Sequence, residues 1–210
     1  MEKEIRQNNI KFEVRQDDNK QTHLQGYAIV FDKLSENLGY FKEIIRRGAL
    51  DDTDMSNVVL DINHDFDKIL ARNNTNNGIG SLTLTVDDKG LYFDAIPTDT
   101  SYARDLLGNM EAGIINKCSF MFTLDYSDDS SREWDWDTTG ERGYDIRRIN
   151  KIQSIYDVSI VTNPAYEDTS CITYKRAKEN FNNNSKMKIL KRKLKLRLKY
   201  EEWLLWKQKK

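Results

Sequence analysis

Three polar residues stand out because each lies in or beside a stretch that otherwise has the pattern of a β-strand. His64 follows an apolar run, Ser119 lies within a second, and Asp157 interrupts a third. Histidine, serine and aspartate are the side chains of acyl transfer, as base, nucleophile and orienting carboxylate. Each also has an ordinary interpretation: a polar turn residue, a structural hydroxyl, and a water-facing residue on an edge strand. Residue types alone leave both interpretations open.

The Cys118-Ser119 pair offers two candidate nucleophiles. Neighbouring side chains of a strand point to opposite faces, so Cys118 shares a face with Phe120 and Phe122. A free thiol packs as a small hydrophobe, which suits that face. The pattern therefore favours Ser119 for chemistry. Asp157 would be costly to bury without a partner, and a histidine could supply one.

Two arginines precede the strand that carries Asp157. Arg147 and Arg148 could bring positive charge to an oxyanion, although a surface position is the more common one for arginine. Ser159 shares the expected face of Asp157 and could act as a hydrogen-bonding neighbour. His23 lies in the polar register of an N-terminal strand, so we expect it at the surface.

Cofactor and metal chemistry find little support in the sequence. The histidines and cysteines are scattered without the spacing of a zinc site. The pair Gly78 and Gly80 lacks the third glycine of a dinucleotide fingerprint, and no phosphate-binding P-loop sequence is present. We therefore expect no metal and no cofactor.

The elements that must position these residues are mostly strands. Alternating or clustered apolar residues predict strands over 10–15, 24–31, 40–45, 58–62, 81–86, 91–96, 115–124 and 147–162. Apolar residues three and four apart predict one helix over 99–110. We expect a loop over 72–80 and a solvated acidic insertion over 125–145. Strands joined by short turns favour an antiparallel barrel or sandwich.

Charge divides the chain in two. Residues 175–210 hold 14 Lys and Arg against three Glu, whereas the first 174 residues hold 19 basic and 31 acidic residues. We therefore expect a body domain at 1–174 and a basic tail at 175–210, with a linker at 182–185. The apolar residues of the expected tail helix lie near one face: Met187, Leu190, Leu194, Leu198 and Leu205.

A basic amphipathic tail suits an anionic partner, either an acidic protein surface or nucleic acid. The acidic body makes dedicated nucleic-acid binding the weaker alternative. We expect a cytosolic protein, because no signal-peptide pattern and no membrane-spanning run of about 20 apolar residues is present. Two widely spaced cysteines do not indicate a disulfide framework.

Six blocks, taken in order, resemble the prohead maturation protease family of tailed bacteriophages. They are Gly26-Tyr27-Ala28-Ile29-Val30-Phe31, Phe41-Lys42-Glu43-Ile44-Ile45 with Gly48-Ala49-Leu50, Asn63-His64-Asp65, Gly90-Leu91-Tyr92-Phe93, Cys118-Ser119-Phe120 and Asp157-Val158-Ser159-Ile160-Val161-Thr162-Asn163-Pro164-Ala165. The resemblance covers residues 25–174. Its specificity comes from the ordered set, since each block alone is common.

The resemblance implies a serine endopeptidase in which His64 is the base, Ser119 the nucleophile and Asp157 the third member. Relatives commonly carry Glu at the last position, so the shorter Asp157 changes that contact. The family is similar to herpesvirus assemblins. It therefore implies a mainly β fold with flanking helices, built on a closed antiparallel β-barrel, here followed by the basic helical tail.

The resemblance also implies partners and a place of action. Family members cut the major capsid protein precursor and its scaffold segment inside the assembling prohead, in the host cytoplasm, and usually process themselves. A portal contact and a homo-oligomer are further expectations. The rival interpretations are an inactive capsid assembly or scaffold protein and a nucleic-acid-binding protein that acts through its tail. The Asn-rich loop at 70–77 and the insertion at 127–143 depart from the family pattern without removing a candidate residue.

Overall fold

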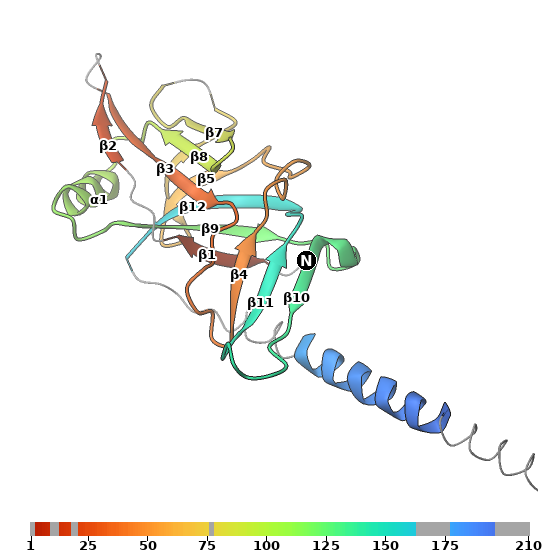
Figure 1. Cartoon of the computed structure of the whole chain (residues 1–210). Helices are drawn as coiled ribbons and strands as arrows, with labels where there is room; N and C mark the ends of the chain where they lie inside the picture. Colours follow the sequence, from red (N-terminus) through yellow and green to blue (C-terminus); the bar gives the residue numbers. More distant parts are fainter. Residues whose placement is uncertain (1–2, 9–12, 18–20, 76–77, 163–176, 196–210) are drawn as a thin grey trace, which may run out of the picture. The chain divides into compact units, whose positions relative to one another are not determined.

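A computed structural model describes residues 3–8, 13–17, 21–75, 78–162 and 177–195 (Figure 1). The chain divides into two compact units, Met1–Glu167 and Asp168–Lys210, and each is described by itself. The domain boundary expected at residue 174 lies outside the described residues and stays a prediction.

The candidate residues lie in a five-stranded sheet. Across the sheet its strands are β1 (Glu4–Asn8), β9 (Lys117–Thr123), β12 (Ser154–Val161), β5 (Val59–Ile62) and β6 (Asp65–Arg72). β12 runs parallel to β5 and antiparallel to β9, and β9 is antiparallel to β1. β9 and β12 are buried almost throughout, as expected for strands covered on both faces. Both strands therefore lie inside the sheet, with β1 at its edge.

A four-stranded antiparallel sheet packs over the core face of this sheet. It has the order β2 (Glu13–Gln16), β3 (Thr22–Val30), β8 (Gly90–Ala95) and β7 (Leu82–Val86). β7 and β8 confirm the strands predicted over 81–86 and 91–96, and β2 and β3 overlap those predicted over 10–15 and 24–31; each pair forms an antiparallel hairpin. A Cβ at Gly90 would lie 1.9 Å from the Ile29 carbonyl oxygen, so β8 can approach β3 this closely only with glycine there.

The third sheet contains β10 (Arg132–Asp135), β11 (Asp145–Ile149) and β4 (Phe41–Ile45), after a short 3₁₀ turn at Asp129–Ser131. The solvated insertion expected over 125–145 is therefore wrong, because β10 pairs with β11. Aromatic contacts hold this segment in place. The ring of Trp134 stacks on that of Trp136 with 4.7 Å between their centroids, and it contacts Phe41 edge-on with 5.1 Å between centroids. Aromatic contacts of this kind hold an otherwise acidic segment on the sheet.

The single strand expected over 147–162 is also wrong, since β11 and β12 belong to different sheets. Isoleucines at 149, 152 and 155 extend across the join, although Asn150, Lys151 and Gln153 interrupt the apolar pattern there. Backbone hydrogen bonds mark the break between the two strands, because consecutive N–H groups there donate to different segments: Ile152 N–H to the Ala49 carbonyl and Gln153 N–H to the Thr123 carbonyl.

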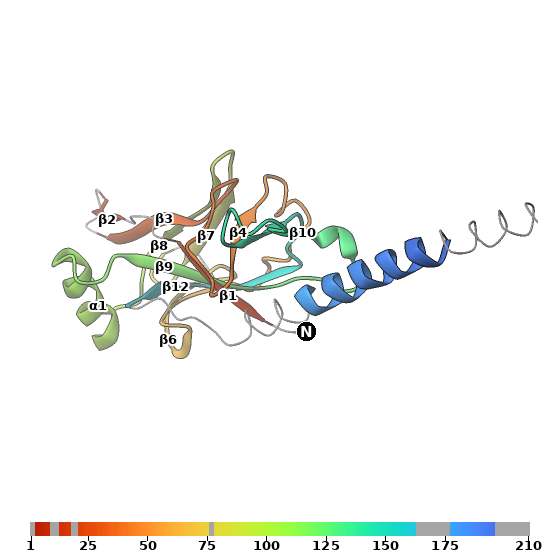
Figure 2. The same cartoon turned by 60° about the horizontal axis from the view of Figure 1, so that its bottom comes forward.

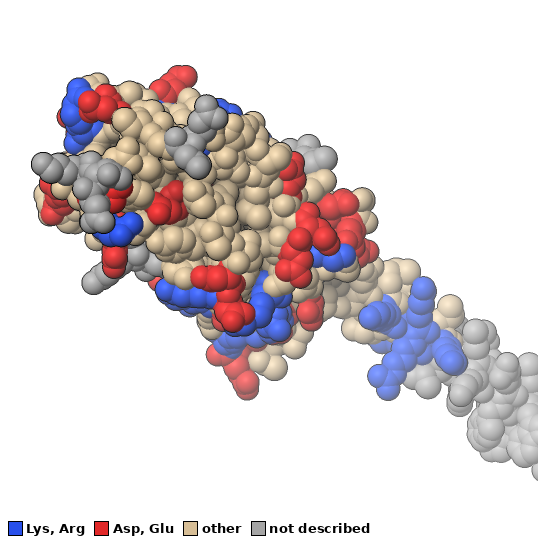
Figure 3. All heavy atoms as spheres, turned by 90° about the horizontal axis from the view of Figure 1, so that it is seen from above, with Lys and Arg blue, Asp and Glu red and all other residues tan. Residues whose placement is uncertain are grey.

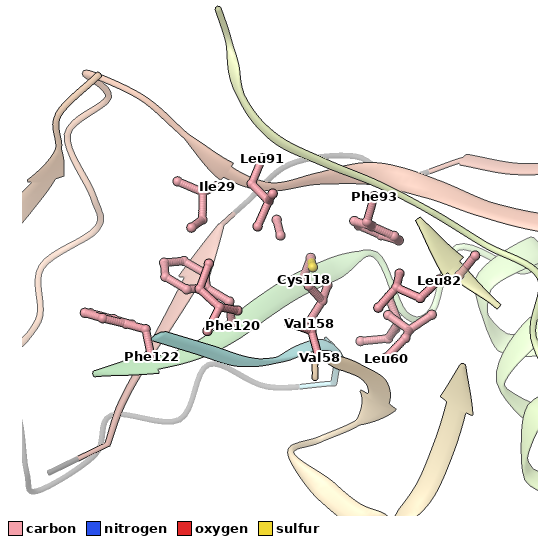
Figure 4. Packing of buried hydrophobic residues seen from close by; sticks show 14 of the residues in the cluster. Ile29, Val58, Leu60, Leu82, Leu91, Phe93, Cys118, Phe120, Phe122 and Val158 are labelled. Atoms are coloured by element: carbon pink, nitrogen blue, oxygen red, sulfur yellow. The ribbon is translucent and has the colours of Figure 1, made fainter. Parts of the chain in front are cut away.

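The predicted helix is confirmed as α1 (Ser101–Glu111), capped by Thr100, whose side chain accepts a hydrogen bond from Ala103 N–H. Buried side chains of α1 and of the two larger sheets form one hydrophobic core. Figure 4 shows Cys118 and Phe120 on the face of β9 that is directed toward Ile29 and Leu91. This leaves the opposite face of β9 for Ser119.

The structure is mainly β with helical elements, but the closed barrel is not confirmed. Among the described residues the three hydrogen-bonded sheets are open, ending at β1 and β6, at β2 and β7, and at β10 and β4. The ladders do not close because β4 pairs with β11 in parallel and does not extend the neighbouring ladders.

Residues 177–195 form a helix, so the linker expected at 182–185 is wrong. Local propensity is a weak guide, and flanking helix-forming residues override the asparagines there. Met187, Leu190 and Leu194 are exposed, while Leu198 and Leu205 lie outside the described residues. Figure 3 shows Lys and Arg side chains on the described part of this helix, and acidic groups scattered over the body. No helix in the described ranges is long and apolar enough to cross a membrane.

Candidate active site

A two-residue turn presents His64. Ile62 pairs with Asp65, so Asn63 and His64 form the whole connection between β5 and β6. Both have positive φ, 56° and 58°, as a tight hairpin turn of this kind requires. Asn63 adopts this conformation readily, whereas for His64 it is a strained one that persists only where the surroundings impose it.

β12 supplies those surroundings. Ser159 Oγ accepts a hydrogen bond from His64 N–H at 2.8 Å, and Asn63 Oδ1 accepts one from Thr162 N–H at 3.0 Å. Asn63 N–H in turn donates to the Ile160 carbonyl at 3.0 Å. The turn is therefore fixed against the strand that also carries Asp157. Ser159 has the neighbouring role expected for it, through its hydroxyl.

A β-bulge places Asp157 on the correct face. Along β12 the partner of Ile155 is Phe122, yet the partner of Asp157 is Met121, so one extra residue is inserted between them. In a regular ladder without the bulge, Asp157 would pair with Phe120 and point into the apolar core. With it, Asp157 shares a face with Ser119. Bulges commonly re-aim side chains next to functional sites.

The structure brings the three sequence-predicted residues together. His64 Nε2 lies 2.7 Å from Ser119 Oγ, and His64 Nδ1 lies 3.0 Å from Asp157 Oδ2. Ser119 and Asp157 are fully buried, and the His64 side chain is 10% exposed. A hydroxyl, an imidazole and a carboxylate in this order can perform nucleophilic acyl transfer.

Asp61 is a fourth member of the site that the sequence analysis missed. It is fully buried on β5, and within the described part of the chain neither carboxylate oxygen has a hydrogen-bond partner. Burial, and then the charge of Asp157, raise the pKa of Asp61 to about 7. The signal was available: Asp61 interrupts an apolar run just as Asp157 does.

We predict that Asp61→Asn changes how stability depends on pH. Between the ordinary carboxyl pKa of 3.8 and about 7, folded wild type keeps a proton on Asp61 that the unfolded chain has lost. Wild type therefore loses stability as pH rises through that range, and asparagine removes this contribution. Calorimetry from about pH 4 to about pH 8 should show the melting temperature of the variant rising relative to wild type. A difference in melting temperature between variant and wild type that does not change with pH would contradict the raised pKa of Asp61.

Asp61, His64 and Asp157 also offer ligand atoms within 4.8 Å of one another, the one set of this kind found in the described residues. Both nitrogens of His64 already face other groups, Nδ1 toward Asp157 and Nε2 toward Ser119. A bound cation would have to replace one of these contacts. The arrangement is better suited to proton transfer.

Cys118 lies in the core, as its position on the strand predicts. It is 1% exposed, and burial raises the pKa of its thiol well above the usual range. A neutral buried thiol is not a nucleophile. His23, expected at the surface, is partly buried instead, with Nδ1 2.7 Å from Asp94 Oδ1.

The two arginines expected near the oxyanion have other partners. Arg147 is fully buried and pairs with Glu4 and Glu43, while Arg148 pairs with Asp135. Burial opposes the charge of Arg147, but the two carboxylates outweigh it and raise its pKa. Neither guanidinium has a hydrogen bond to Ser119 or His64 among the described contacts, so we withdraw the oxyanion assignment for both.

We predict that Arg147→Met destabilises the protein by about 3–5 kcal/mol, because Glu4 and Glu43 then share one buried cation, Arg6, and a buried carboxylate charge is left uncompensated. The matched control is Arg148→Met, which removes a guanidinium that is 26% exposed beside a carboxylate that is 36% exposed. That loss should stay below about 1 kcal/mol. Urea unfolding of both variants measures the difference. Equal losses of unfolding free energy in the two variants would show that the buried ion-pair network stabilises the protein no more than the exposed pair does.

Comparisons with known proteins found a family and a similar solved structure. A family model described as caudovirus prohead serine protease matches residues 10–184. Among solved structures, the capsid assembly protease of bacteriophage T4 is similar at 12% identity with a TM-score of 0.41. That match covers 78% of this chain and 100% of the other. Curated proteins gave no match.

Proposed function

Because this chain belongs to the caudovirus prohead serine protease family, we propose that it is an endopeptidase with Ser119 as nucleophile, His64 as general base and Asp157 as orienting carboxylate. The observation that carries the proposal is the continuous contact from Ser119 Oγ through the imidazole to Asp157. The three groups come from one turn and two strands that are far apart in the sequence. Packing alone gives no reason to bury them together.

In the proposed mechanism His64 Nε2 takes the proton of Ser119 as Oγ bonds to the carbonyl carbon of a peptide. The tetrahedral intermediate collapses when the imidazolium gives that proton to the leaving amine, and the C–N bond breaks. Water then repeats the sequence on the acyl-enzyme and releases the acid. Asp157 holds Nδ1–H and stabilises the imidazolium at each step.

The oxyanion needs donors as well. With Arg147 and Arg148 withdrawn, backbone N–H groups are the proposed source, and each such donor is typically worth about 3–4 kcal/mol. The substrate we propose is the major capsid protein precursor, cut at its scaffold segment inside the assembling prohead. Self-processing belongs to the same proposal, as do a portal contact, a homo-oligomer and action in the host cytoplasm.

The basic tail serves, in this proposal, to attach the protease to an acidic scaffold or capsid surface. Within the described helix Glu179 is the one acidic residue, against Lys178 and Lys186 and the basic residues that follow them. Such attachment would weaken with salt, because exposed charges are screened. Binding to arbitrary DNA would instead favour the nucleic-acid alternative.

Coexpression with the capsid precursor tests the function. Intact mass should show loss of a defined capsid fragment with wild type and none with Ser119→Ala. Uncleaved precursor with both would favour an inactive assembly protein. Cleavage with both would assign the activity to another group or another protein.

A further inference from the structure

β1 covers the nucleophile. It lies along the outer edge of β9, where Gln7 pairs with Ser119 and Ile5 with Met121 (Figure 2). Ser119 Oγ donates a hydrogen bond to the carbonyl of Arg6 at 2.8 Å, and the serine is 0% exposed. No peptide can reach Oγ while this strand is in place.

The same contact takes the proton that catalysis needs. A carbonyl oxygen only accepts, so the single hydroxyl proton of Ser119 points to Arg6. Ser119 therefore does not donate to His64 Nε2, although Oγ and Nε2 lie 2.7 Å apart. While the hydroxyl proton points to Arg6, it cannot pass to the base, so the resting arrangement is blocked both in space and in proton position.

A substrate would need the place that β1 holds. Extended peptides commonly add as a strand to the edge of a sheet, where main-chain hydrogen bonds supply affinity. Without β1, the edge of the sheet would be β9, and the exposed backbone groups would include those beside Ser119. The Arg6 carbonyl already lies where a substrate carbonyl must lie, against Oγ.

We propose that β1 is an internal inhibitor strand, and that substrate binds as an extended peptide along β9 after β1 leaves. The inference rests on the proposed function and adds its peptide-binding edge and its regulation. β1 lies before residues 10–184, the range that the family model matches. The inhibitor strand is therefore a feature of this chain's own N-terminal segment, outside the matched range.

The ion pairs of β1 are compatible with release. Glu4 pairs with Arg147, and Arg6 Nε donates to Glu43 at 2.8 Å. Arg147 Nε also donates directly to Glu43, at 2.6 Å. The body therefore keeps a paired arginine and glutamate when β1 departs, and the two charges on β1 pass to water. Because an unpaired buried charge would be the main cost of release, this arrangement lowers it.

A reversible cross-link tests the inference in the full chain. Ile5 and Met121 are direct cross-strand partners, and partners in an antiparallel pair lie about 4.5–5.5 Å apart between Cα atoms, within disulfide range. The variant is Ile5→Cys/Met121→Cys in a Cys171→Ser background, since Cys118 is buried. Cross-linking is verified by intact mass, and the readouts are precursor cleavage and labelling of Ser119 by a fluorophosphonate probe.

Oxidation should lower both readouts by at least about 100-fold, because the open state is no longer accessible, and a reductant should restore them. The matched control is Thr83→Cys/Asp94→Cys in the β7–β8 hairpin, also a cross-strand pair, where oxidation should change neither readout. If the oxidised variant, with the Ile5–Met121 cross-link verified, is as active as the same variant treated with reductant, the inhibitor-strand proposal is wrong and the protease proposal is unaffected. If the reduced variant and wild type both lack cleavage and labelling, the proposed function fails, and the inference with it.

Discussion

Ser119→Ala is expected to lower kcat/KM for peptide cleavage by about 10⁶-fold, the loss typical of removing a serine nucleophile. Alanine keeps the strand and the packing but has no Oγ to form the acyl bond. It also removes the hydrogen bond to the Arg6 carbonyl, so β1 is held less firmly and substrate access cannot explain the loss. Steady-state cleavage of a precursor-derived substrate measures it.

The control is Ser131→Ala. Ser131 is a serine with the same burial, 1% exposed, that donates to the Asp125 carbonyl far from the His64 contact. Its removal should leave kcat/KM within a few-fold, at a modest cost in stability. Comparable activity in Ser119→Ala and Ser131→Ala would contradict the nucleophile assignment.

His64→Gln is expected to cause a similar loss, about 10⁶-fold, because Ser119 then has no base to take its proton. Glutamine keeps a polar group at the turn but cannot accept and return a proton in the required way. Asp157→Asn should cost less, about 10⁴-fold, since it disturbs the orientation of the imidazole and leaves the nucleophile and base in place.

The double variant Ser119→Ala/His64→Gln tests whether the two residues act together in one catalytic step or contribute independently to kcat/KM. Residues that act as one unit are strongly non-additive, so the double variant should be no slower than either single variant. A further loss of several orders of magnitude would mean that the two residues act in different steps. Thermal unfolding of each variant excludes loss of the fold as the cause.

Alternation and turn chemistry predicted the parts of the fold in which one face of a strand is buried. The hairpin around Gly90 and the position of α1 follow from periodicity alone. The same argument placed Cys118 in the core and Ser119 on the other face. These predictions succeed because side-chain period and burial are local properties of a strand.

Long-range pairing decided what the sequence could not give. Asp157 reaches the site only through a bulge, and β11 and β12 belong to different sheets although isoleucines recur across the join at 149, 152 and 155. Sheet closure depends on which edges pair, and β4 pairs with β11. None of these choices changes the local pattern.

β1 escaped prediction for a different reason. Its residues are mostly polar, and Glu4 and Arg6 have the pattern of a solvated terminus. They are buried because Arg147 and Glu43, more than 30 residues away in the chain, complete a charge network. Asp61 was missed although it interrupts an apolar run as Asp157 does, because its place beside Asp157 and His64 depends on strand pairing. The resemblance identified the catalytic candidates, but it said nothing about what covers them.

The most direct test of the central claim is to identify the residue that a fluorophosphonate modifies as peptidase activity disappears. The covering strand slows the reaction, so incubation continues until activity is lost, and peptide mass spectrometry then locates the adduct. We predict one adduct, on Ser119, formed in step with inactivation and absent from His64→Gln. Inactivation with the adduct on another residue, or full activity with Ser119 modified, would contradict the account.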